Sequence, residues 1–390
     1  MKRIFALTLL FMLLFSCASH GFEPSLSADS AVLMCADTGD ILFEKNKDTA
    51  MPPASVTKIM TMLITMEEIE KGNLNYDDVV TASEHAKAMG GSTIFLDAGE
   101  KMTVRDLLKG VAVASANDAC VALAEHIEGS EEAFVERMNS RAAELGMKNT
   151  KFLNTNGLDE EGHVSSAYDI ALMSRELLCH KDIFDFTTIW TDSLRDGKFL
   201  LANTNKLVRF YDGATGLKTG STSLAGCCIS ATAEREGLGL IAVIMHAPDS
   251  KSRFADARTL LDYGFSRYSL WRYDDTDSVI GTVKVIKGME KTVPAVPEKG
   301  VSLIINKGGG GSVQMKAELA EEVVSPVKKG DKLGTLSFYL NNEKLGECAL
   351  TAKEDVERIT LGRIYLNFLK QLAFISEGET PMQRRNALEK

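Results

Sequence analysis

Residues 55–70 read SVTKIMTMLITMEEIE, and this stretch decides how the first part of the chain is organised. Its apolar side chains occupy positions nearly all round a helix: Val56, Ile59, Met60, Met62, Leu63, Ile64, Met66 and Ile69. A helix with so little polar face is buried on every side. The stretch therefore predicts a central helix around which a domain packs.

Strands are predicted on both sides of this helix. Residues 31–36 and 41–43 are apolar runs joined by the turn sequence Asp37-Thr38-Gly39-Asp40, which predicts a hairpin. Further helices are expected over residues 102–128, 131–145 and 167–178, and further strands over residues 227–233 and 240–245. Strands at both ends with helices between them indicate an α/β (α+β) fold, in which helices surround one central antiparallel sheet.

The composition changes near Trp271. Short β-type runs punctuated by Gly and Pro follow, which predicts a second, small all-β domain over residues 275–356. Residues 357–390 then repeat apolar side chains at helical spacing, interspersed with Arg and Lys, and predict an amphipathic helix with a polar tail. Such a helix lies either on a membrane surface or against the β-domain, and the sequence leaves both open.

The N-terminus has the pattern of an export signal. Lys2 and Arg3 precede an apolar run over residues 4–15, and small residues follow it. The run is too short for a membrane-spanning helix, so residues 1–21 are interpreted as a signal peptide. An uncleaved N-terminal anchor and lipidation at Cys17 are the alternatives. The mature protein is expected outside the cytoplasm, at the outer face of the cytoplasmic membrane or in the periplasm or cell wall.

Charge and cysteine content exclude several classes of protein. The 390 residues include 44 Lys and Arg against 54 Asp and Glu, so the formal net charge of −10 argues against a nucleic-acid partner. Seven cysteines are too few for a disulfide scaffold at this length, and we expect most of them to be free and buried. Neither an HExxH motif nor a Cys/His cluster with ligand spacing is present, so no metal and no cofactor is predicted.

Ser55-Val56-Thr57-Lys58 at the head of the buried helix is the first of three motifs that carry chemistry. A spacing of three places Ser55 and Lys58 on one helical face. A serine hydroxyl becomes a nucleophile when a base removes its proton, and a desolvated lysine can be that base. The helix N-terminus adds backbone N–H groups that favour a developing oxyanion.

Two further motifs follow in order along the chain. Ser115-Ala116-Asn117 follows a helical stretch, and Lys218-Thr219-Gly220 opens a strand that continues through Ser221 and Thr222. Each motif alone has an ordinary structural explanation, as a helix cap or a strand entry. Together, SxxK, SxN and KTG are the signature of serine β-lactamases and penicillin-binding proteins.

On these motifs the chain resembles the low-molecular-mass penicillin-binding proteins of peptidase family S11, which act as serine-type D-Ala-D-Ala carboxypeptidases. The similarity covers residues 25–270 most strongly and extends more loosely through the β-domain and terminal helix. Longer stretches that match the family's pattern are residues 52–61, 115–119, 154–158 and 216–222. The resemblance implies a β-lactamase/transpeptidase-like catalytic domain, peptidoglycan stem peptides ending in D-Ala-D-Ala as substrates, and β-lactams as inhibitors.

The resemblance also implies roles for single residues. Ser55 is the nucleophile, Lys58 its general base, and Ser115 relays a proton to the leaving group. The backbone N–H groups of Ser55 and Ser221 would form the oxyanion hole. The implied substrate-binding residues are Asn117 for the amide, Lys218 and Thr219 for the terminal carboxylate, Gly220, Ser221 and Thr222 along the strand, and Arg253 as an aid to carboxylate binding.

Two rival functions share these motifs. A class A β-lactamase would need an acidic residue before the asparagine of residues 150–154, and that stretch has none. A non-catalytic protein that binds the cell wall or a β-lactam would retain the fold without turnover. Ser221 stands where many relatives carry a histidine after KTG, which leaves substrate preference and pH profile open. His163 is the histidine nearest to the chemistry, and we expect it at the rim of the site.

Overall fold

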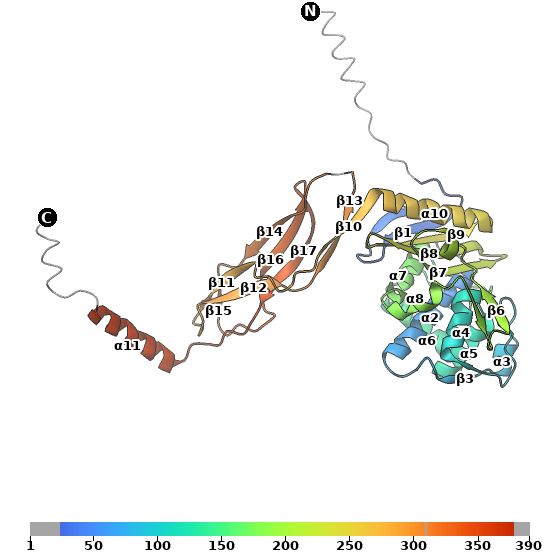
Figure 1. The fold of residues 1–390 in the computed structure, drawn as a ribbon, viewed down its shortest axis with the longest axis horizontal. Coiled ribbons are helices and arrows are strands. Elements are labelled where there is room, and N and C mark those ends of the chain that lie inside the picture. Colours follow the sequence, from blue (N-terminus) through green and yellow to red (C-terminus); the bar gives the residue numbers. More distant parts are fainter. Residues whose placement is uncertain (1–23, 309, 378–390) are drawn as a thin grey trace, which may run out of the picture. The chain divides into compact units, whose positions relative to one another are not determined.

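The computed structural model describes residues 24–308 and 310–377, which divide between Ser269 and Leu270 into two compact units (Figure 1). The predicted signal peptide, residues 1–21, lies outside the described residues, as does the end of the predicted polar tail. Six cysteines are described, all of them with free thiols, and Cys179 among them is exposed.

A five-stranded antiparallel sheet forms the first unit, in the order β2-β1-β9-β8-β7. The predicted hairpin is confirmed as β1 (Ser30–Cys35) and β2 (Ile41–Lys45). The two late strands are β8 (Gly226–Arg235) and β9 (Leu238–Ala247), and β9 pairs with β1, so both ends of the unit meet in one sheet. The strand β7 (Ala214–Thr222) lies at the edge.

Helices cover both faces of this sheet. The helix α10 (Ser250–Arg267) lies on one face, and α7 (Ala167–Leu177) packs on the other together with the helices around it (Figure 1). At the centre of that second layer is α2 (Lys58–Glu70), whose side chains are nearly all buried, as the sequence predicts. One detail differs: Ser55 belongs to a 3-10 turn, η1 (Ala54–Thr57), that precedes the α-helix.

The helix predicted over residues 102–128 is interrupted. Its first two residues belong instead to the strand β4 (Lys101–Thr103), and α4 (Val104–Lys109) continues into a π-helical turn over Gly110–Ala114. Ser115 then adopts a left-handed backbone with φ 63°, and α5 (Asn117–Glu128) begins two residues later. Apolar residues lie on both sides of this break, so their spacing alone predicts one helix. A left-handed residue cannot continue a right-handed helix, and the helix ends there.

The remaining elements of the first unit connect these layers. The predicted helices over residues 131–145 and 167–178 are confirmed to within one residue as α6 (Glu131–Glu144) and α7. The short elements are β3 (Val79–Thr81), α3 (Glu84–Lys87), η3 (Lys181–Ile183), α8 (Phe184–Thr187), β5 (Thr191–Leu194), β6 (Phe199–Ala202) and α9 (Leu207–Phe210).

The second unit is rich in β-structure, as its composition predicts. A six-stranded sheet has the order β14-β16-β17-β12-β11-β15, and β10 pairs with β13. The strands are β10 (Tyr268–Tyr273), β11 (Gly281–Ile286), β12 (Thr292–Pro297), β13 (Val301–Asn306), β14 (Gln314–Leu319), β15 (Glu322–Val324), β16 (Lys332–Leu340) and β17 (Glu343–Ala352). Phe338 fills its core against Trp271 and Tyr273.

The helix α11 (Leu361–Glu377) follows the second sheet. Its first turns leave large apolar side chains exposed, among them Leu361, Ile364 and Phe368. Within residues 24–308 and 310–377, no helix combines the length and the hydropathy that crossing a bilayer requires.

Candidate active site

Ser55 and Lys58 meet at the junction of the 3-10 turn and α2. The Nζ of Lys58 lies 2.9 Å from the Oγ of Ser55. Lys58 is fully buried, whereas Ser55 is partly exposed. The pair therefore presents a reachable hydroxyl backed by an amine that water does not surround.

Two amide oxygens complete the surroundings of the Lys58 nitrogen. It donates to the Oδ1 of Asn117 and to the main-chain carbonyl of Asn156, each at 2.6 Å. Both oxygens can only accept, so they take two hydrogens of the amine in either charge state. When the amine is neutral, its lone pair is left facing Ser55, which is the orientation that a general base needs.

Burial changes the protonation of this amine. It lowers the pKa of Lys58 from 10.5 to about 8, with a smaller opposing effect from the negative charge of Asp118. At pH 7 about a tenth of Lys58 is then neutral, whereas an ordinary lysine would be almost wholly protonated.

Asn117 connects this pair to a neighbouring segment of chain. Its Nδ2 donates to the carbonyl of Gly90 and its backbone N–H to the carbonyl of Ser92, both at 2.7 Å. The left-handed conformation of Ser115 positions the first turn of α5, where Asn117 lies, beside α2. Ser115 is 5% exposed, and its hydroxyl bonds to none of the residues that the structure describes.

The edge strand β7 brings the third motif to Ser55. The KTG residues lie in the middle of this strand, which begins at Ala214 and not at Lys218 as predicted. A Cβ on Gly220 would lie 2.9 Å from the backbone nitrogen of Ser55, so only glycine allows this approach. Among the described strands β7 pairs only with β8, so it is an edge strand of the sheet.

Lys218 adds a second buried amine to the site. Its Nζ donates to the carbonyl of Thr219 at 2.8 Å, and the side chain is 1% exposed. Burial, together with the positive charges of Lys58 and Arg253, holds the pKa of Lys218 well below its ordinary value. The Thr219 hydroxyl donates to the hydroxyl of Thr204 at 2.7 Å, a neighbour that the sequence did not indicate.

Arg253, in the first turn of α10, binds the backbone of β7. One Nη donates to the carbonyl of Gly220 at 3.0 Å, and the other donates to the Ser250 hydroxyl at 3.1 Å. The side chain is 6% exposed, and its Nε has no partner among the described residues. A carboxylate near this group would meet an additional positive charge.

The loop over residues 153–163 supplies the groups that the sequence did not identify. Asn156 acts through its main-chain carbonyl, so no side-chain pattern could reveal it. Thr155 fixes the loop: its N–H and hydroxyl donate to Glu131 at 3.0 and 2.7 Å, and its carbonyl accepts from Thr61 at 2.6 Å. Gly157, with φ 85°, packs so closely that a Cβ would lie 1.9 Å from the carbonyl oxygen of Ala54.

The sequence predicts His163 at the rim of the site. This prediction is wrong: His163, at the end of this loop, is only 3% exposed. At the outer end of the loop, Asp159 accepts a hydrogen bond from the Thr222 hydroxyl at 2.6 Å, which connects the loop to the end of β7. Ser221 is exposed beside it, with its Oγ 3.5 Å from the Sγ of Cys227.

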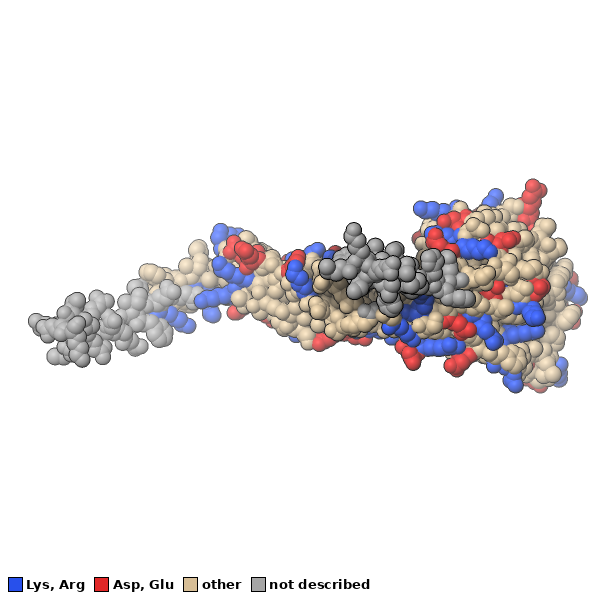
Figure 2. All heavy atoms as spheres, turned by 90° about the horizontal axis from the view of Figure 1, so that it is seen from above, with Lys and Arg blue, Asp and Glu red and all other residues tan. Residues whose placement is uncertain are grey.

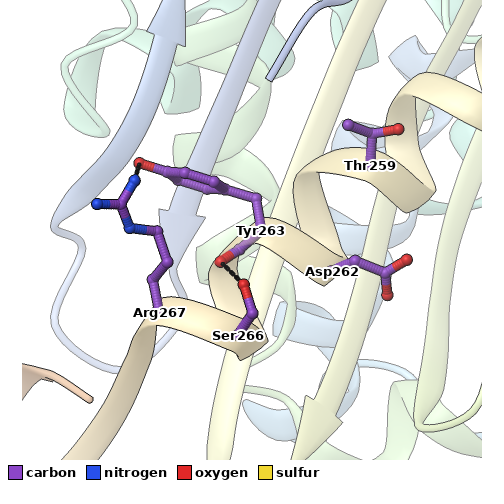
Figure 3. A pocket seen from close by; sticks show the side chains of 5 residues that line it. All are labelled: Thr259, Asp262, Tyr263, Ser266 and Arg267. Atoms are coloured by element: carbon purple, nitrogen blue, oxygen red, sulfur yellow. Dashed lines mark hydrogen bonds between the residues drawn. The ribbon is translucent and has the colours of Figure 1, made fainter. Parts of the chain in front are cut away.

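A separate pocket of about 540 Å³ opens on α10, and Figure 3 shows five of its lining residues. Ser266 donates to the Tyr263 carbonyl, and Arg267 donates to the Tyr263 hydroxyl, so these polar groups satisfy one another (Figure 3). None of the motif residues is among these five. On the face seen in Figure 2, basic and acidic side chains of the first unit are interspersed rather than gathered by sign.

Comparison with known families matches both units. Residues 18–249 match the peptidase S11 family, described as D-alanyl-D-alanine carboxypeptidase. Residues 273–358 match the family described as penicillin-binding protein 5, C-terminal domain.

Individual relatives agree with this assignment. The chain is 42% identical to D-alanyl-D-alanine carboxypeptidase DacF of Bacillus subtilis, over 95% of this chain and 98% of that protein. It is 32% identical to D-alanyl-D-alanine carboxypeptidase DacC of Escherichia coli, over 86% of this chain and 85% of DacC. Among solved structures, penicillin binding protein 5 from Haemophilus influenzae has a TM-score of 0.79 at 31% identity, covering 86% of this chain and 99% of that one. Penicillin-binding protein D2 from Listeria monocytogenes, in an ampicillin-bound form, has a TM-score of 0.57 at 32% identity, covering 63% and 100%.

Proposed function

Because the chain belongs to the peptidase S11 family of D-alanyl-D-alanine carboxypeptidases and is a serine hydrolase of that activity, we propose that Ser55 is its nucleophile and Lys58 its general base. The observation that carries this assignment is the Lys58 nitrogen, which two amide oxygens orient toward the Ser55 hydroxyl. The substrates are peptidoglycan stem peptides that end in D-Ala-D-Ala, and β-lactams bind at the same site.

The first chemical step is acylation. Neutral Lys58 accepts the hydroxyl proton as the Oγ of Ser55 attacks the carbonyl carbon between the two D-alanines. The backbone N–H groups of Ser55 and Ser221 stabilise the resulting oxyanion. The close packing of Gly220 on the Ser55 backbone supports this role, because it brings β7 next to Ser55. Collapse of this intermediate breaks the C–N bond, and the nitrogen of the leaving D-alanine takes a proton through Ser115.

The substrate is held along β7. Its backbone adds to the free edge of the strand, and its terminal carboxylate meets Lys218 and the Thr219 hydroxyl, with Arg253 contributing charge. Asn117 holds the substrate amide, and Gly220, Ser221 and Thr222 border the added strand. Water then hydrolyses the acyl-enzyme and restores Ser55.

Intact-mass measurement of the protein after treatment with penicillin tests the assignment of the nucleophile. We expect one β-lactam adduct per chain, located on Ser55 by peptide mapping and missing from Ser55→Ala. Release of D-alanine from a D-Ala-D-Ala peptide should be lost in the same variant. An adduct on another residue would contradict the assignment, and rapid nitrocefin turnover without D-alanine release would favour a β-lactamase instead.

We also propose that the protein is exported through residues 1–21 and rests on a membrane surface through α11. The support for the second point is the exposure of Ile364 and Phe368, at 48% and 55%, beside the basic Arg363. An amphipathic helix of this kind buries its apolar side chains at the lipid interface while basic side chains meet anionic headgroups.

Co-sedimentation with vesicles that contain anionic lipid tests this location. The double variant Ile364→Glu/Phe368→Glu should lose binding and keep penicillin acylation. Met315→Glu is the matched control, because Met315 is also an exposed apolar residue, at 52%, but lies on β14. Equal binding by the double variant and the control would contradict the proposal.

A further inference from the structure

His163 is a buried histidine that the reaction described above does not use. Its ring contacts two different parts of the site. The Nε2 lies 2.9 Å from the Thr57 hydroxyl oxygen, and the Nδ1 accepts the backbone N–H of Leu153 at 3.1 Å. Thr57 lies between Ser55 and Lys58, and Leu153 begins the loop that carries Asn156.

These contacts determine the tautomer of the ring. A backbone N–H can only donate, so Nδ1 is unprotonated and the hydrogen of the neutral ring is on Nε2. The Nε2–H therefore donates to the Thr57 hydroxyl. A doubly protonated ring would place an N–H of its own against the N–H of Leu153, and that contact would break.

The surroundings favour the neutral ring. Burial lowers the pKa of His163 from 6.5 to about 4; the positive charge of Lys58 acts in the same direction, and the negative charge of Asp159 opposes both. Phe152 packs its ring edge-on against the imidazole, with centroids 5.9 Å apart. The ring thus keeps one tautomer throughout the pH range in which Lys58 changes charge.

We infer that His163 is a positioning residue for the general base: its ring ties the Thr57 turn to the start of the Asn156 loop and so holds the Asn156 carbonyl on the Lys58 nitrogen. The two ends of this bridge are close to the atoms concerned. Thr57 directly precedes Lys58, and Leu153 is three residues from Asn156, whose carbonyl accepts from Lys58 at 2.6 Å. If the bridge is removed, the loop shifts and water reaches the amine.

The inference rests on the proposed role of Lys58 and predicts a kinetic effect that a purely structural histidine would not have. In His163→Phe, the second-order rate constant for acylation by a fluorescent penicillin should fall by about tenfold or more. The pH at which this rate is half-maximal should rise above the wild-type value, because an amine that water reaches has a pKa closer to that of an ordinary lysine. His163→Asn should recover part of the rate, since its Oδ1 can accept the Leu153 N–H.

Thr57 tests the same bridge from its other end and remains informative if His163→Phe does not fold. Thr57→Val removes the acceptor of the Nε2–H at nearly constant volume, so it should slow acylation and raise the half-maximal pH. Thr57→Ser keeps the hydroxyl and should stay close to wild type on both measures.

An unmoved half-maximal pH in the folded His163→Phe or Thr57→Val protein would overturn the inference, even if the melting temperature falls. The proposed function is tested separately: if wild-type protein forms no adduct on Ser55, the role of that residue fails, whereas failure of the bridge leaves wild-type acylation intact.

Discussion

The side-chain nitrogen of Lys58 lies 2.9 Å from the hydroxyl oxygen of Ser55, and its two remaining partners are the amide oxygens of Asn117 and Asn156. Three segments distant in sequence therefore meet at one nitrogen atom. The first is the head of the buried helix, the second is the start of α5, and the third is a loop with no regular structure. The chemistry depends on all three, and each can be tested separately.

Acylation should depend on pH through Lys58. In the proposed role the amine must be neutral to accept the Ser55 proton, and its pKa is about 8, so the acylation rate should rise with pH and be half-maximal near pH 8. Lys58→Ala should lower the rate at every pH by about 10²- to 10⁴-fold, the usual contribution of a general base. Stopped-flow acylation by penicillin between pH 6 and 10 measures both. A flat profile in wild-type protein would contradict the assignment of Lys58 as the base.

Gly157→Ala should disrupt the 3-10 turn η1, which contains Ser55. The new Cβ would lie 1.9 Å from the Ala54 carbonyl oxygen, and the backbone at this position has φ 85°. Either the turn or the loop must move. The acylation rate should therefore fall by about a hundredfold, which corresponds to an activation barrier about 3 kcal/mol higher. Gly162→Ala is the matched control in the same loop: its φ is 91°, but its nearest neighbour is a Leu153 methyl at 3.7 Å.

The control should show only the strain of a left-handed residue, about 1–2 kcal/mol of stability, with acylation nearly unchanged. Thermal unfolding and acylation kinetics on both variants separate the two effects. Similar acylation rates in Gly157→Ala and Gly162→Ala would show that the close approach to Ala54 has no catalytic importance.

Asp118→Asn should destabilise residues 94–96, whose backbone the Asp118 carboxylate binds. The buried Asp118 carboxylate accepts the backbone N–H groups of Ile94 at 3.1 Å and Leu96 at 3.0 Å. An amide has only one accepting atom, and its NH₂ would face a donor. The free energy of unfolding should therefore fall by about 1–3 kcal/mol in urea titration.

Asp97→Asn is the control for this variant, because Asp97 is an exposed carboxylate of the same segment that pairs with Lys87 at 3.3 Å. An exposed ion pair contributes about 1 kcal/mol or less. Equal losses in the two variants would contradict a special role for the buried carboxylate.

His163 should make stability depend on pH in acid. Its pKa in the folded protein is about 4, below the ordinary 6.5, so between these values the unfolded chain binds a proton that the folded one does not. The free energy of unfolding should therefore fall as the pH is lowered from about 6.5 to about 4. The fall should amount to about 3 kcal/mol in all, without further loss from this group below that range.

Urea titrations of wild type and His163→Phe across this range measure the contribution, because the carboxylates affect both proteins alike. The difference in stability between the two proteins should shrink as the pH falls. A constant difference would show that His163 is protonated to the same extent in the folded and unfolded states.

Much of this protein could be predicted from short-range patterns. Residues 55–70 are apolar nearly all round, which predicts the buried helix, and the Asp37–Asp40 turn closes a hairpin locally. SxxK, SxN and KTG each consist of neighbouring residues whose chemistry is contained in their side chains, so Ser55, Lys58 and Lys218 are candidates that the sequence alone proposes.

The tertiary structure alone decided what depends on main-chain atoms and on the meeting of distant segments. The left-handed backbone of Ser115 ends one helix before α5 begins, and KTG lies mid-strand because β7 extends back to Ala214. The Asn156 carbonyl is a group that every residue carries, so no composition could single it out. His163 is expected at the rim of the site from its place after the Asn154–Gly157 turn, but folding buries it between Thr57 and Leu153. Sequence determined which candidate groups the site contains, and the packing of the loop on the helix determined how the Lys58 nitrogen is oriented toward Ser55.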